Sequence, residues 1–255
     1  MSQHTLTLLR FTYKKLKEKL TVSDSKKLFH EKFPYVIPGL YKRIVDEMLV
    51  ELNLLNHQNE FTQDYLFCVG LTETFKELMK GYQPEKHLDL LFESLCSSTN
   101  FEAKEINEIS KKSQKEFKDK TSKDIFKLLI EKSNSKLYPS RILNLGIYIL
   151  ISNSQDFKEK NESDKNKMTS DIFEKLSLSA NKAEKDIGIY KSSISKMEQA
   201  KELIEELRIK DKKKEQISVS YTHLRANETP EHRGRRVVRV KKKMGGGGGG
   251  GAGGG

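Results

Sequence analysis

The chain has 255 residues, of which 35% are hydrophobic and 33% charged, and its formal net charge is +11. That composition supports a packed core in one large domain or two small ones. The charge is uneven, because residues 219–255 hold eight Lys and Arg against two acids, a net of +6. The remaining +5 is spread over residues 1–218 with both signs interspersed, which is typical of a solvated surface rather than a nucleic-acid-binding one.

The sequence shows no sign of secretion or of crossing a membrane. Its start contains Arg10 and no long apolar run, so no secretory signal is predicted. The most apolar stretch, residues 142–151, is too short to cross a bilayer, for which a helix needs about 20 residues. Cys68 and Cys96 form no CxxC pair and are expected to be buried in a reducing compartment, with a disulfide or a reactive thiol as the alternative. We therefore expect an intracellular protein, soluble or at most peripheral to a membrane.

Apolar residues at alternating spacings of three and four predict an amphipathic helix over residues 5–20. A short helix follows, with Thr21, Ser23 and Asp24 as candidate N-caps, and it must end before the extended segment bracketed by Pro34 and Pro38.

The clearest helix begins at Gly39 and directs one apolar face inward (Leu40, Ile44, Val45, Met48, Leu52 and Leu55). Further helices are predicted over residues 64–80, 85–97, 102–118, 121–133 and 139–152, the first of them capped by Gly81. No alternation typical of a strand is present. The sequence therefore predicts an all-α fold with a helical bundle domain over residues 1–152.

Residues 153–170 are polar and almost without apolar anchors, which predicts a linker or loop. A heptad seam then runs from Phe173 to Ile204 and predicts a long C-terminal helix over residues 171–217 with coiled-coil character. Either this helix folds back on its own bundle, or part of it offers a binding surface to a partner. In the second case the partner-binding residues are Ile187, Tyr190, Ile194 and Met197.

Residues 218–255 show no core pattern and end in a glycine tract, which behaves as a flexible coil. The stretch VSYTHLRANETPEH resembles a translated sequencing adapter, so we interpret this segment as a disordered translation artefact. A genuine basic tail that binds nucleic acid or anionic lipid is the alternative.

Motifs for catalysis, metals and cofactors are missing from the sequence. The six histidines show no paired ligand spacing, and HExxH, GxxxxGK[ST], GxGxxG and GxSxG do not occur. Residues 11–20 are the one local stretch that interleaves basic and aromatic residues, and a solvated helix explains them better than nucleic-acid binding. We expect no cofactor and no enzymatic activity.

Several motifs occur in the order and spacing of a known family. They are VSDSK at 22–26, P-x-L-Y-x-R-x-V-D-E-x-L-V-E from Pro38 to Glu51, G-L-T at 70–72 and M-K-G-Y at 79–82. Through them the chain closely resembles the thylakoid-formation, or photosystem II biogenesis, family of cyanobacteria and chloroplasts. One departure is Asp64–Tyr65, which lacks the Pro that usually precedes Leu-Phe in the family.

The resemblance implies a non-enzymatic role in photosystem II biogenesis and repair and in thylakoid organisation. It also implies association with an FtsH-type membrane protease and photosystem II components, at the cytoplasmic side of the thylakoid membrane of a cyanobacterium. A basic helical nucleic-acid-binding protein is the alternative, and it rests on net charge alone.

Overall fold

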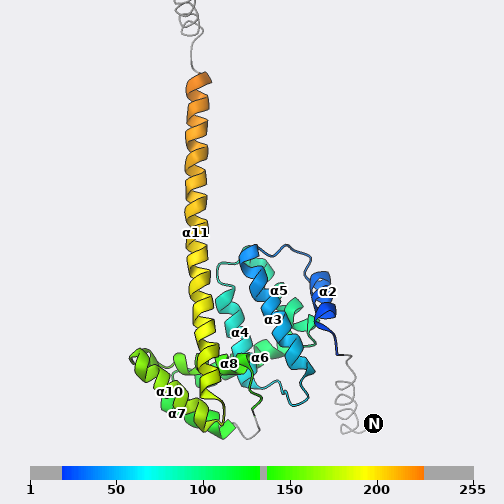
Figure 1. The fold of residues 1–255 in the computed structure, drawn as a ribbon, viewed down its shortest axis with the longest axis vertical. Coiled ribbons are helices and arrows are strands. Elements are labelled where there is room, and N and C mark those ends of the chain that lie inside the picture. The colour runs from blue at the N-terminus through cyan, green and yellow to red at the C-terminus, as the bar shows by residue number, and fades with distance from the viewer. Residues whose placement is uncertain (1–18, 133–136, 227–255) are drawn as a thin grey trace, which may run out of the picture. The chain divides into compact units, whose positions relative to one another are not determined.

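The computed structural model describes residues 19–132 and 137–226, with side chains up to residue 214. Within these ranges all regular structure is helical and no strand occurs, which confirms the predicted all-α class. The chain runs through the helices in the order shown in Figure 1. Residues 5–18 of the first predicted helix and residues 227–255 lie outside the described residues, while residues 19 and 20 are not helical and residues 218–226, predicted to be disordered, continue the last helix.

The first two helices are α2 (Val22–Lys32) and α3 (Gly39–His57). A capping box begins α2, in which Asp24 N–H donates to Thr21 Oγ1 over 3.1 Å and Thr21 N–H donates to Asp24 Oδ2 over 3.2 Å. The extended segment between the helices carries the two expected prolines. Since Asn53 of α3 donates to Leu20 O and Ser25 Oγ, both over 2.8 Å, a buried amide fastens α3 to the start of α2.

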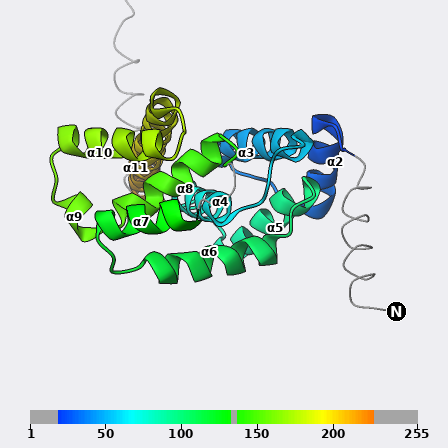
Figure 2. The same cartoon turned by 90° about the horizontal axis from the view of Figure 1, so that it is seen from below.

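The next elements are α4 (Tyr65–Leu78), the short 3-10 helix η1 (Glu85–His87), α5 (Leu88–Ser98) and α6 (Ala103–Phe117). Asp64 caps α4 by accepting from Phe67 N–H over 2.7 Å. In Figure 2, α4 lies among α3, α5, α6 and α8, and its closest packing partners are α8 and α6. This central position explains why ten of the fourteen residues of α4 are buried.

The helices α7 (Ser122–Lys132), α8 (Arg141–Ser152), α9 (Gln155–Lys158) and α10 (Glu162–Lys175) follow. The prediction of a linker over residues 153–170 is wrong, because α9 and the first half of α10 occupy this segment. A few well-spaced anchors suffice to hold it. Phe157 is buried, and Met168 is partly buried against the same hydrophobic cluster.

The last element, α11 (Ala180–Ala226), is one continuous helix of 47 residues. It begins at Ala180 rather than at residue 171, because Ser177 adopts a φ of 58° and the chain turns there. Leu178 N–H donates to Phe173 O over 2.9 Å and closes the end of α10. Contacts along the backbone divide the chain into two compact units, with the boundary after Ala200. Because α10 and α11 as far as Ala200 fall in the first unit, they belong with the bundle.

Two hydrophobic clusters form the core of the unit that ends at Ala200. The first gathers residues of α2, α3, α4 and α5, and the second gathers residues of α7, α8, α9 and α10. Four helices, α4, α6, α8 and α11, contribute to both clusters. Among them, α4 and α8 pack most extensively on each other and form the centre of the bundle.

Candidate protein-binding surface

The four residues predicted to bind a partner lie on the first part of α11. Ile187 and Met197 are buried, with 7% and 6% of their surface exposed, and they join the second and the first hydrophobic cluster respectively. Tyr190 and Ile194 are half-buried. This part of the heptad seam therefore packs on the protein's own bundle, as the first of the two sequence interpretations had it. A partner cannot reach Ile187 or Met197 in this arrangement.

Tyr190 is the member of this group that lines a recess between helices. The recess is bordered by Met48 of α3, Leu78 of α4 and Ile142 of α8. Burial raises the pKa of the Tyr190 hydroxyl, and the negative charge of Glu77 adds to this effect. The ring therefore stays neutral at physiological pH and can donate a hydrogen bond from the edge of an apolar hollow.

An ion pair between α3 and α8 borders this recess. Arg141 donates to Glu51 Oε2 from Nε over 2.9 Å and from Nη2 over 2.5 Å. Burial raises the pKa of Glu51, while the positive charge and hydrogen bond of Arg141 partly offset that rise. One turn further along α8, Asn144 donates to Asp186 Oδ2 of α11 over 2.8 Å. Polar contacts thus tie α8 to both α3 and α11.

An open groove of about 780 Å³ lies next to this ion pair, along the outward face of α3. Its apolar part is formed by Val50 and Leu54 of α3 with Tyr138 and Pro139, which precede α8. Leu54, in the last turn of α3, is 53% exposed. The apolar part is therefore open to solvent along the C-terminal half of α3.

Charged side chains of both signs surround that apolar part. Lys42, Arg43, Asp46 and Glu47 of α3 line the groove, with Lys26 of α2 opposite. Arg43 and Glu47 pair over 2.8 Å, and Lys26 and Asp46 over 3.5 Å. An apolar centre within a charged rim is the usual anatomy of a protein-binding surface. We take this groove, together with the neighbouring Tyr190, as the candidate site.

Sequence reasoning missed most of this groove. It treated the charges of α3 as solvated and did not single out Val50 or Leu54. The spacing of these two residues, one helical turn apart and outside the inward-facing set, was the available signal. The contribution of Tyr138 and Arg141 had no such signal, because only the fold brings them beside α3.

The described residues offer no arrangement suited to metal or thiol chemistry. No cluster of three or more His, Cys, Asp or Glu side chains there could hold a metal ion. Cys68 and Cys96 are free and fully buried. Burial raises the pKa of the Cys68 thiol to about 12, and it raises the pKa of Cys96 as well. Both therefore behave as small core residues rather than as nucleophiles.

Two other features concern membranes and nucleic acid. Of the helices in the described part of the chain, none combines the length and the apolar character that crossing a bilayer requires. The two basic segments considered for nucleic-acid binding, residues 11–20 and 219–255, fall almost entirely outside the side chains that the structure describes.

Comparison with known proteins gives a consistent result. The profile of the family described as "Thylakoid formation protein" matches residues 21–137 and 127–218. Protein Thf1 of Prochlorococcus marinus strain MIT 9312 is 88% identical over 199 residues, which cover 78% of this chain and 99% of that protein. Protein Thf1 of Synechococcus sp. strain CC9605 is 38% identical, covering 77% of this chain and 92% of its own length.

A solved structure, that of Psb29, has the same fold. It superimposes with a TM-score of 0.67 at 26% sequence identity, covering 77% of this chain and 98% of the Psb29 chain. The family match ends at residue 218, so residues 219–255 lie beyond it. The groove, the recess and the ion pair all lie within the matched region.

Proposed function

Because the chain belongs to the thylakoid formation protein family, we propose that it is a non-enzymatic factor for photosystem II biogenesis and repair. In this proposal it associates peripherally with the cytoplasmic side of the thylakoid membrane. It acts there by binding an FtsH-type membrane protease and photosystem II components. The observation that carries the proposal is the family match, which extends from α2 well into α11 and includes the whole candidate surface.

The groove along α3 supports a role in protein binding. It offers exposed apolar area at Leu54, flanked by the paired charges of Arg43 and Glu47. Exposed surface ion pairs contribute little to stability, about 0–1 kcal/mol each, so these charges are available to re-pair with a partner. A protein segment that carries an apolar side chain between charges of both signs fits such a surface better than a uniformly charged nucleic acid does.

Co-purification from solubilised cyanobacterial thylakoids tests the proposal. The full chain, carrying an affinity tag, is compared with Leu54→Asp, which places a charge in the apolar centre of the groove. The matched control is Ile130→Asp on α7, a helical residue of similar exposure (45% against 53%) that lies outside the groove. Circular dichroism establishes that all three proteins are equally helical.

We expect the unmodified chain and Ile130→Asp to recover the protease, and Leu54→Asp to recover much less. Equal recovery by all three would move the binding surface away from the groove, to the exposed side of α11 or to another face. Recovery of the protease by none of them would contradict the proposed association. Recovery of nucleic acid that persists after removal of residues 219–255 would favour the nucleic-acid-binding alternative, whereas recovery that is lost with them would show only the electrostatics of that segment.

A further inference from the structure

A second hollow lies on another side of the bundle, between α8, α9, α10 and α11, and the proposed function does not use it. Its volume is about 500 Å³, within the range of small-molecule sites, roughly 300–1,000 Å³. Phe157, Phe173 and Ile187 line its inner part and are themselves buried, while Tyr148 forms a partly buried wall. The inner part of the hollow is therefore aromatic and aliphatic.

Two lysines at this hollow share a single carboxylate. Glu162 lies 3.4 Å from Lys165 Nζ and 3.6 Å from Lys191 Nζ. Lys165 Nζ is 6.0 Å from the centre of the Phe157 ring, and Lys191 Nζ is 5.5 Å from that of Tyr148. The two cations thus converge over the aromatic lining and exceed the charge of their common partner by one.

Both lysines are less exposed than the anion, although Lys191 is itself 45% exposed. The Lys165 side chain is only 21% exposed, whereas Glu162 is 70% exposed. Glu162 is also the first residue of α10, beside a helix N-terminus that attracts negative charge. Because Glu162 is so exposed, its carboxylate can turn into solvent, and an anion that replaces it would meet the same two lysines and the same helix N-terminus.

Gly188 of α11 leaves the space open. A Cβ atom built on Gly188 would meet no other atom within 4 Å, although the residue lines the hollow. Glycine is a poorer helix former than alanine, so its presence in this helix has no local structural benefit. At this position a longer side chain would occupy the volume that a ligand needs.

From these contacts we propose that the hollow binds a single-chain amphiphile with an anionic head group, either a carboxylate or a phosphate. The head group pairs with Lys165 and Lys191 in place of Glu162. The acyl chain lies along Tyr148 and Phe157 toward Phe173 and Ile187. A lipid-derived anion of this kind is the class of ligand whose charge and apolar length match the two halves of the hollow.

Isothermal titration of the full chain with decanoate and with decyl phosphate tests the proposal, and the two arms distinguish the head groups. Decan-1-ol controls for the charge, and acetate and inorganic phosphate control for the chain. We expect saturable binding of at least one amphiphilic anion, about tenfold tighter than decan-1-ol. Replacement of both lysines, by Lys165→Gln and Lys191→Gln, should weaken that binding about tenfold.

Two further variants separate a ligand site from a structural effect. Glu162→Gln removes the internal competitor and should tighten binding of the anion. Gly188→Leu should abolish binding by filling the hollow, whereas Gly188→Ala, a matched control, should retain it. Neither Gly188 variant should lower the melting temperature, since the Cβ enters open space. The proposal fails if decan-1-ol binds as tightly as the anions, if Gly188→Leu binds normally, or if no amphiphile binds.

Discussion

Gly70 of α4 and Gly146 of α8 face each other where the two central helices cross. A Cβ atom on Gly70 would lie 2.0 Å from Ile142 O, and one on Gly146 would lie 2.0 Å from Leu66 O. The backbones of α4 and α8 are therefore in direct contact, and neither position leaves room for a side chain. Because α4 and α8 join the two hydrophobic clusters, this contact sets the spacing on which the rest of the bundle is built.

We predict that Gly146→Ala lowers the free energy of unfolding by about 3 kcal/mol, although alanine is the better helix former. The added methyl group would overlap a carbonyl of α4, and the helices would have to separate. Thermal denaturation followed by circular dichroism measures the change. Gly188→Ala is the control in an open helical position and should raise the melting temperature. A neutral Gly146→Ala would show that the helices are not in contact at this point.

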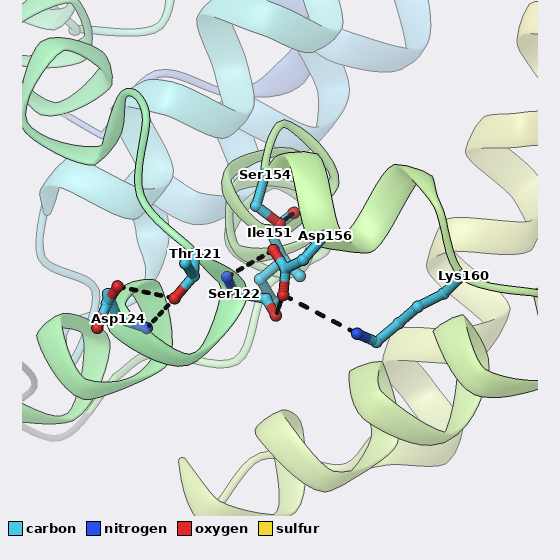
Figure 3. A network of polar contacts seen from close by, with 7 residues as sticks. All are labelled: Thr121, Ser122, Asp124, Ile151, Ser154, Asp156 and Lys160. Carbon is cyan, nitrogen blue, oxygen red and sulfur yellow. Dashed lines mark hydrogen bonds and ion pairs between the residues drawn. The ribbon is translucent and has the colours of Figure 1, made fainter.

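A polar network joins α7 to α9 around Asp156 (Figure 3). Asp156 Oδ1 accepts from Ser122 N–H over 2.9 Å, its other oxygen accepts from the Ser122 hydroxyl, and Lys160 lies 3.9 Å away. Burial opposes the charge of Asp156, but the hydrogen bonds from Ser122 and Ser154 and the charge of Lys160 outweigh it. The pKa of Asp156 therefore falls below its ordinary 3.8.

This lowered pKa predicts how stability depends on pH. A carboxylate with a depressed pKa in the folded state stabilises the fold above its unfolded pKa of 3.8. That contribution is lost as the pH falls below 3.8, through the folded pKa. Asp156→Asn should cost about 1 kcal/mol at pH 7 and much less at the acid end, where the native side chain is itself protonated. An equal loss at every pH would contradict the account.

The pair of Glu51 and Arg141 gives a second electrostatic prediction. Arg141→Met would leave Glu51 in a largely buried place without its cation, and should cost about 2 kcal/mol at pH 7. The pKa of Glu51, already raised by burial, would rise further. The cost should therefore shrink as the pH falls through that pKa and Glu51 becomes protonated. Urea unfolding at several pH values tests this, and Glu51→Gln combined with Arg141→Met should restore most of the stability.

The positions of Ile187, Tyr190, Ile194 and Met197 predict two classes of variant. Ile187→Ser and Met197→Ser empty buried positions and should each cost about 3 kcal/mol. Tyr190→Ser and Ile194→Ser alter half-buried side chains and should cost less. Denaturant unfolding of the four single variants measures this order. Uniformly small losses would instead return all four residues to the role of a partner-binding face.

Much of the fold could be predicted from local patterns. The helices α2 to α8 coincide with predicted segments to within a few residues. Their caps and apolar spacing depend only on residues that are close together in the sequence. The contact of Gly70 with Gly146 could not be predicted in this way. It depends on two helices that are far apart in the sequence, and a glycine inside a helix does not indicate by itself what approaches it.

The errors have a similar cause. Residues 153–170 were predicted as a linker because their apolar residues are sparse, yet Phe157 reaches the core and holds α9 in place. The heptad spacing continues through Leu176 and therefore predicts one uninterrupted helix there. The backbone instead turns at Ser177, which separates α10 from α11. The groove could not be predicted for the same reason, because only tertiary packing brings Tyr138 and Arg141 beside α3.

Recovery of photosystem II activity after strong light is the most direct measurement of the proposed role. A cyanobacterial strain that lacks the endogenous family member would be complemented with this chain, with Leu54→Asp, or with Ile130→Asp. We predict slow recovery in the deletion strain, restoration by the unmodified chain and by Ile130→Asp, and poor restoration by Leu54→Asp. Normal recovery in the deletion strain, at the rate of the parent, would contradict a role in photosystem II repair.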